Sequence, residues 1–187
     1  MKSIIIFASG KGSNALNIIE HFKSRPEDVH IAYIISNKAE AGVLEHAKNY
    51  QIPFKIINTE ALNSSAFCDF LSNLNADLIV LAGFLKKIPS SIIQAYPNKI
   101  INIHPSLLPK YGGKGMYGHH VHEAVKAANE QETGITIHWV NEQYDKGNHI
   151  LQAYCPIAAQ DSPMDIATKI SELEKTYFPI CIDFLLQ

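Results

Sequence analysis

The stretch Lys99–Pro109, KIINIHPSLLP, joins an apolar run to a loop that contains two prolines. The apolar run predicts a buried strand, and the prolines end it because proline has a fixed backbone torsion and donates no ladder hydrogen bond. The strand must therefore stop near His104 and give way to a rigid loop. In an open parallel sheet, ligands bind beyond the carboxyl ends of the strands, where Asn102 and His104 would lie. The alternative is a hydrogen-bonded core histidine beside a turn-forming asparagine.

The residues before this stretch alternate between short apolar runs and segments with apolar residues at helical spacing. The expected strands cover residues 2–7, 29–36, 54–57, 77–82 and 99–103. The expected helices cover residues 13–24, 39–51, 61–75 and 90–97. This alternation predicts an α/β fold with a Rossmann-like, mostly parallel sheet and helices on both faces.

The rest of the chain predicts a helix, a strand pair and a final helix. These cover residues 119–130, then 134–144 and 149–157, and then the segment after residue 162. Gly147 lies in the turn between the two strands, where it can take a positive φ, and the strand pair makes the sheet mixed. The final helix has Ser162 as its N-cap and Pro163 at its first position, and Pro179 is expected to interrupt it.

Length and composition limit the class of protein. The 187 residues suffice for one well-packed domain, so we expect residues 1–187 to form a single domain. The 47% hydrophobic content is typical of a globular protein, and a net charge of -2 gives no reason to expect nucleic acid as a partner. No apolar run is long enough to span a bilayer or to serve as a signal peptide, so we expect a cytoplasmic protein with no membrane partner. The odd number of cysteines, three, predicts reduced core residues.

A glycine turn, GKGSNA at residues 10–15, follows the first expected strand and opens the first expected helix. Free backbone N–H groups and the positive end of a helix dipole meet at such a turn, which favours a phosphate group. NAD is disfavoured because the second expected strand ends without the Asp or Glu that binds a ribose, and the G-K-[ST] spacing of a Walker A motif is missing. The alternative is a structural turn in which Ser13 or Asn14 caps the helix.

Three segments together resemble one family. They are ASGKGSN at residues 8–14, NIHPSLLPKY at residues 102–111, and GITIHWVNEQYDKGNHI at residues 134–150. The chain resembles the formyltransferase family that uses 10-formyltetrahydrofolate as co-substrate. The motifs GSN at 12–14, LAGF at 81–84 and HPSLLPKY at 104–111 are similar to the branch of that family that formylates the amine of glycinamide ribonucleotide in purine biosynthesis.

The resemblance implies that Asn102, His104 and Asp145 are catalytic. Attack of an amine on a formyl carbon concentrates negative charge on one oxygen, and an amide N–H and an imidazolium are suitable donors to it. A carboxylate at Asp145 favours the cationic form of His104 and can carry the proton that leaves the amine. Taken alone, Asp145 also suits a simple turn. The chemistry needs no metal and no covalent intermediate.

The resemblance also implies the residues that bind the two substrates. The ribonucleotide would be held by Gly12, Ser13, Asn14 and Glu174. The folate would be held by Leu85, Lys86, Lys87, Ile88, Asn102, Asn141, Glu142, Gln143, Tyr144 and Asp145. Lys86 stands where the family commonly has arginine, so the planar fork of that contact is lost. Thr136 and His138 would support the site from the strand that leads to Asp145.

Other interpretations stay open. A formyltetrahydrofolate hydrolase would use water as the acceptor and would leave the Gly12–Asn14 turn without a use. A non-catalytic folate or nucleotide binding protein would leave the three catalytic residues unexplained. The cluster HHVH at residues 119–122 fits no zinc spacing, so we expect no functional metal. The chain would act as a monomer or a homodimer.

Overall fold

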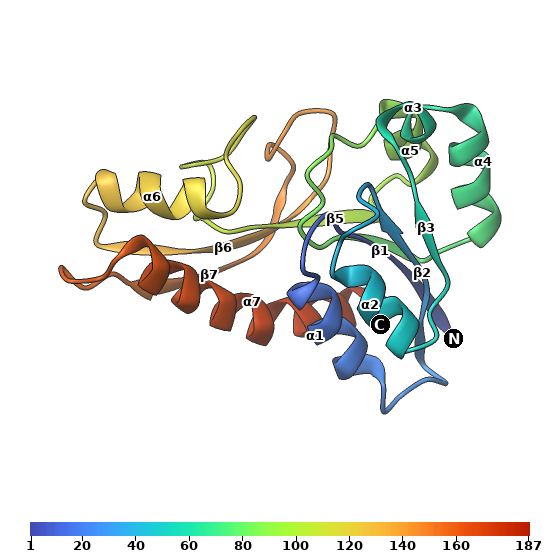
Figure 1. Cartoon of the computed structure of the whole chain (residues 1–187), viewed down its shortest axis with the longest axis horizontal. Coiled ribbons are helices and arrows are strands. Elements are labelled where there is room, and N and C mark those ends of the chain that lie inside the picture. Colours follow the sequence, from blue (N-terminus) through green and yellow to red (C-terminus); the bar gives the residue numbers. More distant parts are fainter. The chain divides into compact units, whose positions relative to one another are not determined.

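The computed structural model describes residues 1–187 (Figure 1). The strands are β1 Lys2–Phe7, β2 Val29–Ser36, β3 Phe54–Ile56, β4 Leu78–Leu81, β5 Ile100–His104, β6 Glu132–Trp139 and β7 His149–Pro156. The helices are α1 Ser13–Phe22, α2 Val43–Asn49, α3 Thr59–Leu62, α4 Ser65–Leu74, α5 Ser90–Ala95, α6 His119–Ala127 and α7 Pro163–Leu186. The seven strands follow the order β3-β2-β1-β4-β5-β6-β7. The mostly parallel sheet ends in an antiparallel pair, which confirms the predicted fold class.

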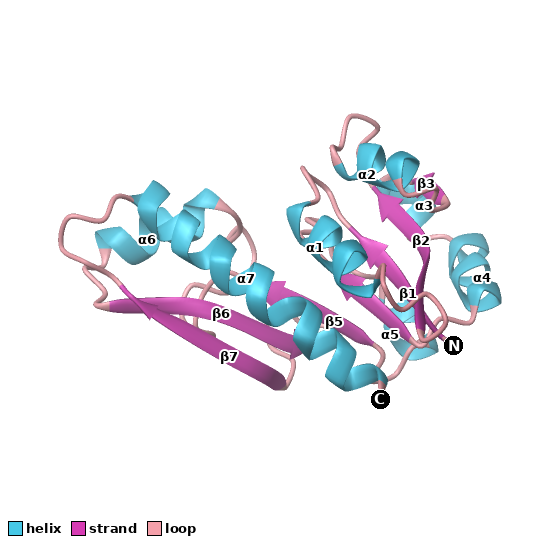
Figure 2. Ribbon diagram, turned by 90° about the horizontal axis from the view of Figure 1, so that it is seen from below, coloured by secondary structure: helices cyan, strands magenta, loops and turns pink.

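The chain divides into two compact units, and the first comprises residues 1–102 together with 185–187. Its strands pair in parallel, β1 with β2 and β4, β2 with β3, and β4 with β5. Helices α1 and α2 cover one face of these strands and α4 and α5 the other (Figure 2). Ile4, Ile5 and Ile6 are fully buried, because a strand covered on both faces has no solvent side. The single domain expected from length stays a prediction.

The helix expected over residues 61–75 is two helices. Asn58 caps α3 by accepting a hydrogen bond from the Ala61 N–H at 2.7 Å, and Ser64 caps α4 by accepting from the Phe67 N–H at 3.2 Å. Each cap fixes a new helix start, because it satisfies an N–H group that has no partner within its own helix.

The second unit comprises residues 103–184 and contains the antiparallel pair β6 and β7. The turn between these strands does not have the conformation that we expected. The positive φ, 53°, belongs to Asp145 rather than to Gly147. Gly147 is required for a different reason, since a Cβ atom there would overlap the carbonyl oxygen of Trp139. The close approach of two backbones therefore excludes a side chain at this position.

Helix α7 begins as predicted, at Pro163 after Ser162. The Ser162 hydroxyl accepts from the Asp165 N–H at 3.2 Å, and the Asp165 carboxylate accepts from the Ser162 N–H at 2.8 Å. The expected interruption at Pro179 was wrong, because the helix continues through it. Phe178 and Ile182 beside this proline are fully buried, and their packing outweighs the lost backbone hydrogen bond. None of the helices has the length and apolar content that crossing a bilayer requires.

The cysteines only partly meet the expectation of core residues. Cys181 is buried, whereas Cys68 and Cys155 are half-buried, and all three are free thiols. Burial raises the pKa of Cys181 to about 11 and also raises the pKa of Cys155. These two thiols therefore stay protonated at neutral pH and are poor nucleophiles.

Candidate active site

His104 is the last residue of β5, and its side chain is almost fully buried. Its Nε2 atom lies 2.8 Å from the carbonyl oxygen of Tyr111, so Nε2 carries the proton and donates it to that carbonyl. Its Nδ1 atom lies 3.6 Å from the Asp145 carboxylate. The prolines after His104 turn the chain back, which brings Tyr111 within reach of the imidazole.

Asp145 lies between two imidazoles in the second unit. One carboxylate oxygen, Oδ2, faces His104 and accepts a hydrogen bond from the Gly113 N–H at 2.8 Å. The other oxygen, Oδ1, lies 3.6 Å from Nε2 of His138, a residue of β6. The Asp145 side chain is 11% exposed, so water screens these contacts only weakly. The turn between β6 and β7 thus places the Asp145 carboxylate next to His104 at the end of β5.

The charge state of Asp145 follows from opposing effects. Burial raises the pKa of the carboxyl, but the contact with His138, the electrostatic interaction with His104 and the Gly113 N–H outweigh it. The pKa of Asp145 is therefore lowered below its ordinary value, and the group is a carboxylate at neutral pH.

Opposing effects also set the charge state of His104. Asp145 raises the pKa of this imidazole, and so does the hydrogen bond to Tyr111. Burial lowers the pKa by more than these contacts raise it, so the net shift is downward. The neutral form is therefore favoured at neutral pH in the chain without substrate, a protonation state that the sequence had left open.

A buried polar network holds the proline loop that follows His104. The Thr136 hydroxyl donates to the carbonyl of Ser106 at 2.7 Å and accepts from the N–H of Leu108 at 3.0 Å. The Gln152 amide donates both to the carbonyl of Leu108 at 3.0 Å and to Thr136 at 2.9 Å. Strands β6 and β7 therefore fix the loop, and the support of Thr136 for catalysis stays a prediction.

Asn102 lies two residues before His104 in β5, so the two side chains project to the same face of that strand. In the first unit Asn102 pairs with Leu81, the last residue of β4. The segment Leu85–Ile88, predicted to contact folate, follows β4. The Leu85 N–H donates to the hydroxyl of Ser9 at 2.9 Å, which joins the chain after β4 to the chain after β1.

The glycine turn after β1 is the start of α1. Gly12 is the N-cap, with a φ of 80°, and no side chain caps this helix. A Cβ atom on Gly12 would lie 2.7 Å from the side chain of Val43, so both the backbone conformation and the space require glycine. The alternative in which Ser13 or Asn14 caps the helix was wrong. The N-terminus of α1 is thus left to backbone N–H groups, which suit an anion.

The remaining predicted site residues differ in exposure. Lys86 and Lys87 are exposed and Ile88 is buried, so Ile88 can act only through its backbone or as packing. Glu174 is half-buried in α7. The four residues before Asp145 are exposed, namely Asn141, Glu142, Gln143 and Tyr144. The Asn141 side chain accepts from the Gln143 N–H at 2.9 Å and thereby shapes this turn.

The chain is similar in sequence to a known family and to several known proteins. Residues 2–182 match the family described as formyl transferase. The chain belongs to the formyl transferase family. Among relatives, the phosphoribosylglycinamide formyltransferase of Haemophilus influenzae is 38% identical over 192 residues, covering 100% of this chain and 88% of the relative. The chloroplastic phosphoribosylglycinamide formyltransferase of Arabidopsis thaliana is 36% identical over 186 residues, covering 96% of this chain and 64% of the relative.

Solved structures of this formyl transferase family have the same fold. The crystal structure of phosphoribosylglycinamide formyltransferase from Bacillus halodurans matches with a TM-score of 0.89 and 34% identity, covering 100% of this chain and 96% of the other. The chain nevertheless spans only 64% and 61% of the length of the relatives from Arabidopsis thaliana and Vigna unguiculata.

Two contacts of the group around His104 and Asp145 could not be found from the sequence. The Tyr111 carbonyl and the Gly113 N–H both contact the site. Both are backbone groups, so side-chain identity gives no sign of them. The glycine content of the loop was the only related signal, because Gly113 has a φ of 100°.

Proposed function

We propose that the protein transfers the formyl group of 10-formyltetrahydrofolate to the amine of glycinamide ribonucleotide, a step of purine biosynthesis. The observation that carries this proposal is the buried group of His104, Asp145 and His138, in which a carboxylate lies 3.6 Å from each of two imidazoles. A water-poor site with preorganised charges of this kind suits acyl transfer.

In the proposed reaction, the amine attacks the formyl carbon and the carbonyl oxygen becomes an oxyanion. We assign the Nε2–H of His104 and the side-chain N–H of Asn102 as its donors, with the formyl oxygen taking the place of the Tyr111 carbonyl. As negative charge develops on the oxygen, the proton affinity of His104 rises, and the Asp145 carboxylate stabilises the imidazolium. The neutral ground state of His104 is therefore compatible with its role.

The proton balance uses Asp145. The attacking amine loses a proton to the Asp145 carboxylate, directly or through one water, and becomes the amide nitrogen of the product. The bond between the formyl carbon and N10 of the folate then breaks, and N10 takes up the proton as tetrahydrofolate leaves. The lowered pKa of Asp145 keeps the carboxylate ready to accept at neutral pH. These proposed steps involve neither a metal ion nor a covalent bond between enzyme and substrate.

Substrate binding is assigned from the resemblance and supported by local structure. The N-terminus of α1 at Gly12, Ser13 and Asn14 is assigned to the phosphate of the ribonucleotide, and Glu174 to its ribose. The segments Leu85–Ile88 and Asn141–Asp145 are assigned to the folate. Backbone groups on such segments can read the edge of a pteridine without particular side chains, which makes lysine at position 86 tolerable.

Compartment and assembly stay predictions. The name of the Arabidopsis thaliana relative places that protein in the chloroplast, whereas the composition of this chain predicts a cytoplasmic protein. Light scattering, which measures the mass of the particle in solution, would distinguish the predicted monomer from the predicted homodimer.

The proposal is tested by counting both products. Purified protein is mixed with 10-formyltetrahydrofolate and glycinamide ribonucleotide, and tetrahydrofolate and the formylated nucleotide are quantified over time. Transfer predicts equal amounts of the two products and no folate release without the nucleotide. Folate release that is independent of the nucleotide would identify a hydrolase, and binding of folate without either product would identify a binding protein.

A further inference from the structure

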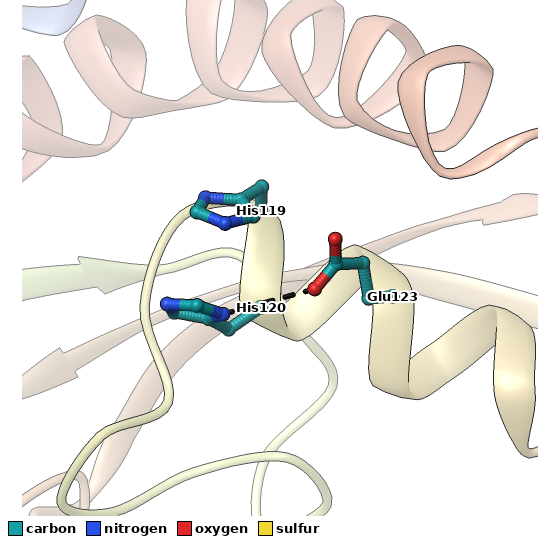
Figure 3. Close-up of side chains that lie close together, drawn as sticks. All are labelled: His119, His120 and Glu123. Atoms are coloured by element: carbon teal, nitrogen blue, oxygen red, sulfur yellow. Dashed lines mark ion pairs between the residues drawn. The ribbon is translucent and has the colours of Figure 1, made fainter.

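Three side chains that can ligate a metal gather at the start of helix α6, apart from the residues assigned to formyl transfer. They are His119, His120 and Glu123, all exposed, and Figure 3 shows how they lie on the first turns of the helix. Each offers one ligand atom, and these atoms lie within 4.8 Å of one another. The two imidazole rings are 4.1 Å apart between centroids, and His120 Nδ1 lies 3.7 Å from a carboxylate oxygen of Glu123.

The sequence spacing of HHVH gave no reason to expect a functional metal, but from the clustering of these ligand atoms we propose that this cluster, the α6 histidine site, binds a divalent transition-metal ion, Zn²⁺ in the first instance. Two imidazole nitrogens and one carboxylate oxygen form a ligand set that suits Zn²⁺ and not Mg²⁺ or Ca²⁺, which prefer oxygen ligands. Ligands about 2.1 Å from a tetrahedral ion are about 3.4 Å apart, so the side chains must close inward. Exposed side chains on one helical turn can do this by rotation about their χ angles.

The local charges permit a cation at this position. The helix dipole at the N-terminus of α6 opposes positive charge, and the carboxylate of Glu123 offsets it. Tyr117 packs edge-on against the ring of His120, with 5.5 Å between the ring centroids.

The α6 histidine site is separate from the proposed chemistry. The transfer of a formyl group by Asn102, His104 and Asp145 needs no Lewis acid, and none of the three ligands belongs to that group. The site keeps coordination positions open beyond its three protein ligands, so water or a small anion completes the shell. It also follows directly on the glycine-rich segment 112–118, so a bound ion would fix the end of that segment.

Isothermal titration calorimetry with ZnCl₂ tests the proposal. The protein is produced without a polyhistidine tag and freed of metal by dialysis against a chelator. The expected result is binding of one Zn²⁺ per chain. His119→Ala and Glu123→Gln should each weaken the affinity by about tenfold or more, while MgCl₂ gives no binding heat. The matched control is His46→Ala on helix α2, a histidine outside the cluster, which should leave the affinity unchanged.

Two outcomes would overturn the proposal. One is a dissociation constant for Zn²⁺ of about 1 mM or weaker, which would be no tighter than binding to scattered surface groups. The other is binding that His119→Ala and Glu123→Gln leave unchanged, which would place the ion elsewhere. Because these side chains are exposed, the variants should fold, and circular dichroism spectra identical to that of the unmodified protein check this.

Discussion

Thr136→Val should destabilise the protein, because it removes the hydroxyl that holds the proline loop after His104. Thr136 is fully buried in β6, and valine has nearly the same shape. The hydroxyl makes three hydrogen bonds, two of them to backbone groups of the loop, the N–H of Leu108 and the carbonyl of Ser106. Both loop residues are buried, so water cannot replace the lost partner.

The size of the effect follows from the groups left unpaired. A buried backbone group without its hydrogen bond costs roughly 1–3 kcal/mol, and two such groups give an expected loss of about 2–4 kcal/mol in the free energy of unfolding. Gln152 keeps its second hydrogen bond, to the carbonyl of Leu108, and adds little to this loss.

Urea denaturation followed by circular dichroism measures this loss, and the same strand provides a matched control. Thr133 is also buried in β6, but its hydroxyl has no hydrogen-bond partner. Thr133→Val should therefore leave the free energy of unfolding unchanged or raise it by up to about 1 kcal/mol. An equal effect of the two substitutions would show that the network contributes nothing, and would refute the reasoning.

Three further substitutions test other parts of the structure. Ser162→Ala removes the N-cap of α7 and should cost about 1 kcal/mol, seen as a fall of roughly 2–4 °C in the melting temperature; an unchanged value would contradict the cap. Gly147→Ala forces a Cβ into the Trp139 carbonyl and should lower both stability, by roughly 2–4 kcal/mol, and kcat/KM; a fully active variant would count against the described turn. Burial lowers the pKa of His104 and of His122 in the folded protein. Below the ordinary value of about 6.5 the unfolded chain therefore binds more protons than the folded one, and the free energy of unfolding decreases as the pH is lowered. Urea titrations between about pH 7.5 and 5.5 should show a smaller fall for His122→Leu, and an identical slope would exclude His122 as a contributor.

Much of the fold could be predicted because its strands are short apolar runs, buried on both faces, between amphipathic helices. The errors have local causes. Pro179 stays within α7 because packing outweighs a local helix breaker, and the helix expected over residues 61–75 divides because Ser64 starts a second one. Gly147 was assigned a positive φ because glycine usually supplies it in turns. Here glycine is required because the backbone of Trp139 approaches too closely for a side chain, and no local sequence pattern reveals that approach.

The catalytic assignment stays a prediction, and the sequence indicated its side chains but not their electrostatics. Asn102 and His104 were predicted from a strand-and-loop motif and Asp145 from a turn, each in a segment that resembles the family. The downward pKa shift of His104 could not be predicted, because it depends on the degree of burial, which a sequence does not specify. His138 was expected only as support, and its contact with Asp145 requires the register of β6 against β7.

The most direct test of the account is the kcat/KM of Asp145→Asn for formyl transfer, compared with Asp69→Asn. Asp69 is an exposed carboxylate on α4, so its substitution is a matched change outside the site. Loss of the proton acceptor should lower kcat/KM by about 10²–10⁴-fold in Asp145→Asn while the protein stays folded, and Asp69→Asn should match the unmodified protein. A value for Asp145→Asn within about threefold of the unmodified protein would contradict the assigned role of the carboxylate between His104 and His138.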